Sequence, residues 1–348
     1  MNNMNERERL LAVLGSREAD RAPCVCPMQT GTLELMKASG AFWPEGHEDP
    51  KTMCALSLAA HRFVGIESVR VPFEASVDAS AFGAKTSDQI LVRRPMILRA
   101  RVPRREDFES MEVPDPSTDG KVPIVLEAIR SLKAKVGNVP IICGIVSPHM
   151  LGFQLIGDQR AMMDMYHDPI FLKAVMHKAK SFAISYATAA AEAGADVITM
   201  VDSFASGDFL SPDEYREFAM PYQAKVCKEV EKLGIPLILH ICGNTTSILP
   251  SMVQTGANGI SIDHEVGIAY AKKIAGDKTA VFGNLCPTTM LLKGTPEEVA
   301  STTSRCLVEG VDAVAPGCGL ALQTPSDNLR AMVKATKQAD PRRRQRPR

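Results

Sequence analysis

The stretch that decides the fold is a strand, a helix and a strand in close succession: GADVITMVD (194–202), SPDEYREFAMPYQAKVCKEVEKLG (211–234) and IPLILHIC (235–242). The first and last runs are short and almost continuously apolar, which predicts strands that are covered on both faces. Ser211, Pro212 and Glu214 form a helix-start signal, and Gly234 predicts the helix stop. This order predicts parallel strands joined by a right-handed crossover.

The same alternation extends in both directions along the chain. Downstream, helices are expected over 246–256, 267–276 and 295–310, with strands over 257–263, 279–284 and 312–317. Upstream, the runs 22–28, 67–73 and 139–147 supply three earlier strands. Eight strands in total favour a single (β/α)8 TIM barrel over an open doubly wound sheet.

Composition limits the class of protein. The chain has 348 residues, 45% of them hydrophobic, and 40 basic side chains balance 40 acidic ones, so no overall field favours nucleic acid or an anionic membrane surface. We expect one catalytic barrel domain over 1–340, with a polar surface excursion over 101–123, and a basic, solvated tail over 341–348. The charged N-terminal sequence and the lack of a membrane-length apolar run predict a cytoplasmic protein.

Metal-binding side chains follow the strand that ends near residue 242. Side chains alternate along a strand, so His240 and Cys242 should project from one face into the mouth of the barrel, where such enzymes place their reactive groups. An isolated His-x-Cys pair is weak evidence for a site. A third ligand would strengthen it, and Cys286 and Cys318 both follow later strands, 44 and 76 residues beyond Cys242. Spacing alone leaves both possible.

An imidazole with two thiolates suits Zn²⁺, which in catalytic sites keeps an open fourth position. The two thiolates neutralise the ion, so a substrate thiol bound as fourth ligand would lose its proton yet remain nucleophilic. Alkylation of a thiol is the chemistry this favours. The alternative is a closed four-ligand zinc that only stabilises loops.

With these residues in view, the chain resembles the uroporphyrinogen decarboxylase superfamily, and within it the zinc-dependent methylcobamide:coenzyme M methyltransferases of methanogenic archaea. The shared motifs run over nearly the whole chain and include DRAPCVCPMQTGT (20–32), VDSFASGDFLSPDEY (201–215), LHICGNT (239–245), FGNLCPTTML (282–291) and GCGLALQTP (317–325). Only LHICGN and GCG are specific to the methyltransferase branch.

The resemblance implies a zinc site at His240, Cys242 and Cys318, which selects Cys318 over Cys286. The decarboxylases carry aspartate where Cys286 stands, so this cysteine departs from the superfamily pattern and its role stays open. They also hold their substrate with arginines in the segment that matches 26–32, where this chain has none, and a family tyrosine is replaced by Phe153. The resemblance therefore disfavours decarboxylation.

The activity that the resemblance implies is transfer of a methyl group from a methylcorrinoid, carried on a small partner protein, to the thiol of coenzyme M in methanogenesis. The protein would supply the nucleophile and its position, and the corrinoid the leaving group. Three rivals are a metal-free tetrapyrrole decarboxylase, a transferase that uses another thiol such as homocysteine, and a corrinoid-handling module without catalytic activity.

Carboxylates at three other strand ends should also reach the mouth: Glu74, Asp202 and Asp263. We expect Glu74 to act as a temporary metal ligand or as the acceptor of the thiol proton. Asp202 matches the DS motif of the superfamily and is expected to touch the corrinoid or the substrate. Asp263 is equally compatible with a structural role.

Polar groups after other strands are weaker candidates. Gln29 and Ser147 could hydrogen-bond a sulfonate, an anion with three acceptor oxygens. His149 and His264 are expected to be structural.

Overall fold

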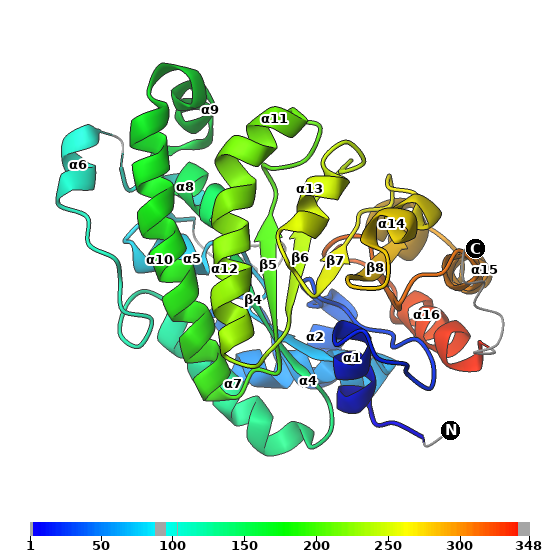
Figure 1. Ribbon diagram of the computed structural model, residues 1–348. Coiled ribbons are helices and arrows are strands. Elements are labelled where there is room, and N and C mark those ends of the chain that lie inside the picture. The colour runs from blue at the N-terminus through cyan, green and yellow to red at the C-terminus, as the bar shows by residue number, and fades with distance from the viewer. Residues whose placement is uncertain (1–2, 88–94, 103, 340–348) are drawn as a thin grey trace.

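The computed structural model describes residues 3–87, 95–102 and 104–339. The expected tail over 341–348 lies outside the described residues. Figure 1 shows a curved parallel sheet flanked by helices. The sheet has the order β1-β4-β5-β6-β7-β8-β9, in which every neighbouring pair is parallel. Its strands are β1 (Val69–Val71), β4 (Ile141–Val146), β5 (Val197–Asp202), β6 (Leu237–Ile241), β7 (Gly259–Ser261), β8 (Ala280–Leu285) and β9 (Ala313–Pro316).

The segment around Cys24 closes the barrel between the two edge strands. Cys24 forms a parallel bridge with Val314 of β9, and the amide of Val25 donates to the carbonyl of Val314 at 3.0 Å. On the other side, the amide of Glu67 donates to the carbonyl of Cys24 at 2.8 Å, just before β1. All eight predicted strand positions are thus occupied, and the prediction of a (β/α)8 barrel is confirmed.

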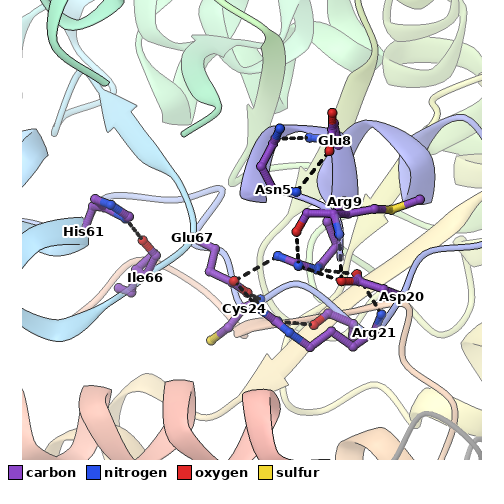
Figure 2. A network of polar contacts seen from close by, with 11 residues as sticks. Asn5, Glu8, Arg9, Asp20, Arg21, Cys24, His61, Ile66 and Glu67 are labelled. Carbon is purple, nitrogen blue, oxygen red and sulfur yellow. Dashed lines mark hydrogen bonds and ion pairs between the residues drawn. The ribbon is translucent and has the colours of Figure 1, made fainter. Parts of the chain in front are cut away.

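A buried network of ion pairs stabilises this closure of the barrel (Figure 2). Glu67, only 1% exposed, accepts from the amide of Cys24 at 2.9 Å and pairs with Arg21 and, at 3.1 Å, with Arg9. Arg9 also pairs with Asp20 at 2.6 Å. Because each buried charge has an opposite charge and a hydrogen-bond partner, the network ties the first barrel segment to α1 and to β1.

Helix α1 (Glu6–Leu14) lies at the amino-terminal ends of the strands. The amide of Arg7 donates to Asn138 ahead of β4, and its side chain pairs with Asp196 ahead of β5. Leu10 and Leu14 of α1 join one buried cluster with strand residues such as Ile142, Val197 and Ile238. The opposite, carboxyl-terminal end of the barrel is therefore the end left for a site.

The helices cover the outside of the barrel and the loops above it. Those in the first half of the chain are α2 (Leu33–Ser39), α3 (Glu45–Glu48), α4 (Pro50–Val64), α5 (Val77–Ala81), α6 (Arg105–Glu109), α7 (Val122–Val136), α8 (Pro148–Ile156), α9 (Asp158–His167) and α10 (Pro169–Ala193). The later ones are α11 (Pro212–Glu214), the π-helical turn η1 (Tyr215–Ala219), α12 (Met220–Lys232), α13 (Leu249–Gln254), α14 (Ile268–Ala275), the π-helical turn η2 (Pro287–Leu292), α15 (Pro296–Val308) and α16 (Ser326–Gln338). No helix among the described residues is long and apolar enough to span a bilayer.

The helix expected over 211–234 is interrupted by the π turn. Ser211 and Glu214 form the predicted capping box, but the amide of Met220 then bonds five residues back, to Tyr215. Pro221 follows at once and has no N–H to donate, which explains why the regular hydrogen-bond pattern breaks there.

The connection between β1 and β4 contains three short elements that the sequence pattern did not predict. β2 (Lys85–Thr86) and β3 (Ile97–Arg99) form a short antiparallel pair, and α6 lies within the expected excursion over 101–123. No described residue of α6 is buried, which agrees with a surface position.

Candidate metal centre

His240, the penultimate residue of β6, is fully buried. Its Nδ1 lies 3.0 Å from the hydroxyl and 3.1 Å from the carbonyl oxygen of Ser261 on the neighbouring strand β7. Because the carbonyl can only accept, this contact favours a hydrogen on Nδ1 and leaves the lone pair on Nε2. Ser261 therefore orients the ring so that Nε2 is free to act as a ligand.

The two thiols predicted from the sequence lie beside this nitrogen. Cys242 Sγ is 3.4 Å from His240 Nε2 and 3.6 Å from Cys318 Sγ. The three donor atoms all lie within 4.8 Å of one another, the one group of at least three possible ligands among the described residues. His240 and Cys242 share a strand face, and Cys318 comes from the loop after β9, three strands further along the sheet. Imidazole and thiolate donors at this spacing can hold a soft or borderline metal ion.

The turn after Cys242 depends on Gly243. Its φ of +75° lies in the left-handed region, and an added Cβ would sit 2.7 Å from Asp208 Oδ2. The amide of Gly243 donates to Asp263 Oδ2 at 3.0 Å. Asp263 also accepts from the amide of His264 at 2.7 Å, so the predicted alternative of a structural carboxylate agrees with its contacts.

The hydrogen bond between the thiols pushes their pKa values apart. The hydrogen bond from Cys318, the largest influence, lowers the pKa of the Cys242 thiol below its ordinary value. The same bond, followed by burial, raises the pKa of Cys318. The two thiols thus lose their protons at different pH, and a cation that binds both as thiolates must displace the protons they carry.

Asp202, the last residue of β5, is the centre of a buried hydrogen-bond network. Its carboxylate accepts from the hydroxyl of Ser147, from Gln223 Nε2 at 3.1 Å and from the amide of Phe204 at 3.0 Å, and lies 3.1 Å from His149 Nδ1. Burial, the largest influence, opposes ionisation, but His149 and these hydrogen bonds lower the pKa of Asp202. The side chain is 0% exposed, so a direct contact with corrinoid or substrate stays a prediction.

The backbone of Asp202 touches the metal centre even though its side chain is turned into this network. Its carbonyl accepts from the amide of Cys242 at 3.3 Å, and the adjacent Ser203 places its hydroxyl 3.6 Å from Cys242 Sγ. Asp202 can therefore position Cys242 without meeting a substrate.

Glu74 is also buried, and it belongs to a separate cluster near the end of β1. Its Oε1 lies 3.5 Å from Lys121 Nζ and 3.6 Å from His47 Nδ1, and Ser76 donates to its other oxygen. Burial is the main cause that raises the pKa of Glu74. Glu74 lies outside the group of three metal donors, so its predicted roles as temporary ligand or proton acceptor stay predictions.

The two residues predicted for a sulfonate have partners within the protein. Gln29 donates from its amide nitrogen to the carbonyl of Leu320 and accepts from the amide of Gly31 at 2.9 Å. Ser147 caps α8 by accepting from the amide of Met150 at 3.2 Å, and donates to Asp202. These contacts engage both side chains within the protein, and their predicted contact with a sulfonate stays a prediction.

Cys286 follows β8 and lies outside the group of metal donors. Burial opposes its ionisation, but hydrogen bonds from Thr288 and Thr289 lower the pKa of the thiol to about 7. Its sulfur accepts from the amide of Thr289 at 3.5 Å as the cap of η2.

Sequence reasoning missed the polar residues that support the site. Ser261 could have been found from strand register, because it lies directly opposite His240 in the β6–β7 pair. Ser203 stands next to Asp202 in the DS motif, but nothing in the sequence points it toward Cys242. His47 and Lys121 carry no signal, because they reach Glu74 from segments that are distant in the sequence.

Fold and site together define a (β/α)8-barrel protein with a His-Cys-Cys centre at the mouth of the barrel. Residues 5–339 match the family model for uroporphyrinogen decarboxylase (URO-D), and the chain belongs to this family. It is 37% identical to the methylcobamide:CoM methyltransferase MtbA of Methanosarcina acetivorans over 338 residues, 97% of this chain and 99% of the relative.

Two further comparisons agree with this placement. The chain is 34% identical to the methylcobamide:CoM methyltransferase MtaA of Methanosarcina barkeri, over 96% of this chain and 98% of the relative. Among solved structures, a methyltransferase from Methanosarcina mazei superimposes with a TM-score of 0.93 at 34% identity, covering 96% of this chain and 99% of that one.

Proposed function

We propose that the protein is a zinc-dependent methyltransferase that moves a methyl group from a methylcorrinoid to the thiol of coenzyme M in methanogenesis. The corrinoid would be carried on a small partner protein. The observation that carries the proposal is the cluster of His240, Cys242 and Cys318, together with relatives that are named for this reaction.

The donor spacing fits zinc. With Zn–S bonds of about 2.3 Å and Zn–N bonds of about 2.05 Å, a tetrahedral ion sets its sulfurs about 3.8 Å apart and a sulfur and a nitrogen about 3.6 Å apart. The corresponding distances here are 3.6 Å between Cys242 and Cys318 and 3.4 Å between Cys242 and His240. Three protein donors leave a fourth position for a substrate thiol.

The residues around the metal centre have different proposed roles. When bound, zinc supplies Lewis acidity that lowers the pKa of a substrate thiol. Cys242 and Cys318 contribute the negative charge that keeps a captured sulfur nucleophilic, and Ser261 holds His240 in its ligand tautomer. Glu74, whose pKa is raised by burial, is our proposed acceptor for the proton that leaves the thiol.

The test is transfer from free methylcobalamin, which needs no partner protein. The purified enzyme is incubated with methylcobalamin and coenzyme M, homocysteine or no thiol, with and without a chelator, and demethylation is followed in the visible spectrum. We expect demethylation that requires both zinc and coenzyme M. Equal rates with homocysteine would indicate another thiol substrate, and rates indifferent to the chelator would refute the metal's role.

A further inference from the structure

A second group of polar side chains lies near the Glu74 end of β1, and three of its donor atoms form no hydrogen bond among the described residues. Thr30 Oγ1, Trp43 Nε1 and Lys121 Nζ are buried atoms that form no hydrogen bond within the part of the chain that the structure describes. Thr30 is 1% exposed and Trp43 is 3% exposed. Buried donors of this kind are costly to leave unpaired, so such a set indicates a place for an acceptor.

Printed contacts join these residues into one neighbourhood. An added Cβ on Gly31, next to Thr30, would lie 3.0 Å from the indole of Trp43. The Trp43 ring lies 4.8 Å from the ring of His47, centroid to centroid, and His47 Nδ1 is 3.6 Å from Glu74 Oε1. Lys121 Nζ is 3.5 Å from the same oxygen, a distance of ion pairing without a hydrogen bond.

The neighbourhood is connected to the metal centre through Gln29. The amide of Leu320, two residues after Cys318, donates to the carbonyl of Gln29 at 3.2 Å, and the Gln29 side chain donates back to the carbonyl of Leu320. Gln29 directly precedes Thr30. Cys318 and Thr30 thus lie on two segments that are hydrogen-bonded to each other.

We propose that Thr30, Trp43 and Lys121 bind the anionic tail of the thiol substrate while its sulfur occupies the metal centre; this inference rests on the proposed function. A hydroxyl, an indole N–H and an ammonium group, each from a different segment of the chain, match the three acceptor oxygens of a sulfonate. They replace Gln29 and Ser147, whose polar groups are engaged within the protein.

Glu74 supplies the charge balance that the pocket needs. As a carboxylate it holds the ammonium of Lys121 and would repel an incoming anion. When the S–H bond of the substrate breaks, its electron pair stays on sulfur and its proton joins Glu74. Lys121 is then free to pair with the tail, and binding changes no net charge in the cluster. Burial, which raises the pKa of Glu74, supports this exchange.

The experiment compares two thiols that differ only in the tail: coenzyme M (2-mercaptoethanesulfonate) and 2-mercaptoethanol, with free methylcobalamin as donor. In the wild type we expect a preference for the sulfonated thiol in kcat/KM. Loss of one charge-assisted hydrogen bond should cut that preference by roughly tenfold to a hundredfold in Lys121→Gln. Trp43→Phe should cut it by a smaller factor, because the indole N–H is a neutral donor.

Lys133→Gln is the matched control, because Lys133 pairs with Asp196 at the opposite end of the barrel. It should keep the wild-type preference. Zinc content and the thermal midpoint of every variant are measured to exclude misfolding. An unchanged preference in a folded, zinc-loaded Lys121→Gln variant would overturn the proposal.

A separate readout keeps this inference distinct from the proposed function. Ethanesulfonate has the tail without the thiol, so Glu74 must take its proton from the solvent, and binding to each zinc-loaded protein is measured by isothermal titration at acidic as well as neutral pH. Weaker binding to Lys121→Gln than to wild type supports the pocket even if no thiol is methylated. Equal binding, or none to wild type, counts against the pocket even if transfer is normal.

Discussion

Replacing Cys318 with alanine should remove the metal while leaving the barrel intact. An apparent binding free energy of about 10–16 kcal/mol for a four-ligand zinc site corresponds to roughly 2.5–4 kcal/mol per ligand. At about 1.4 kcal/mol per tenfold, the loss of one thiolate weakens zinc binding by roughly a hundredfold to a thousandfold. Cys318 lies in the loop after β9 and is partly exposed, so its truncation should cost the fold little.

Zinc per chain is measured by elemental analysis after dialysis against a chelator whose strength lies between the two expected affinities. Wild type should keep one zinc, and Cys318→Ala should lose it together with methyl transfer, at an unchanged thermal midpoint of the chelated proteins. Cys286→Ala is the matched control, because Cys286 also follows a barrel strand but lies outside the donor group. Full zinc content in Cys318→Ala, or zinc loss in Cys286→Ala instead, would refute the assigned ligand set.

Two further outcomes follow from contacts around the barrel. Ser261→Ala removes the hydroxyl that lies 3.0 Å from His240 Nδ1 but leaves the backbone carbonyl. We expect about tenfold weaker zinc binding in chelator competition, and an unchanged affinity would mean that the carbonyl alone orients the ring. Glu67→Gln should destabilise the protein by about 3–5 kcal/mol in urea unfolding at pH 7, because it leaves Arg9 and Arg21 short of a buried counter-charge. Burial, the largest influence on the pKa of Glu67, acts to raise it, but Arg21, the amide of Cys24 and Arg9 lower the folded-state pKa below its ordinary value. The stabilisation that the ionised Glu67 gives is therefore complete above the unfolded-state pKa and is lost as pH falls through the folded-state pKa. The difference in free energy of unfolding between wild type and Glu67→Gln should therefore become smaller as the pH is lowered. A difference that does not change with pH would contradict this interpretation.

For the three carboxylates, the sequence predicted the position along the strand but not the surrounding residues. Their place at the ends of predicted strands put Glu74, Asp202 and Asp263 at the carboxyl-terminal end of the barrel, and the structure agrees: Asp202 ends β5, while Glu74 and Asp263 follow β1 and β7. The structure then gives them different surroundings: Asp202 is enclosed by Ser147, His149 and Gln223, while Glu74 faces Lys121 and His47. Those partners come from distant loops and helices, which local sequence patterns do not bring together.

The sequence by itself determined the eight strands, their parallel order and two of the three candidate metal donors. These features depend on local periodicity and on the shared face of His240 and Cys242, which neighbouring residues are enough to specify. Spacing alone left Cys286 and Cys318 equal, and the resemblance to a family was needed to prefer one. Only the tertiary structure brings Cys318 within 3.6 Å of Cys242 and gathers Thr30, Trp43 and Lys121 near one strand end. The physical reason is that curvature of the closed sheet and the course of its loops set the distances between such residues, and both are properties of the whole barrel.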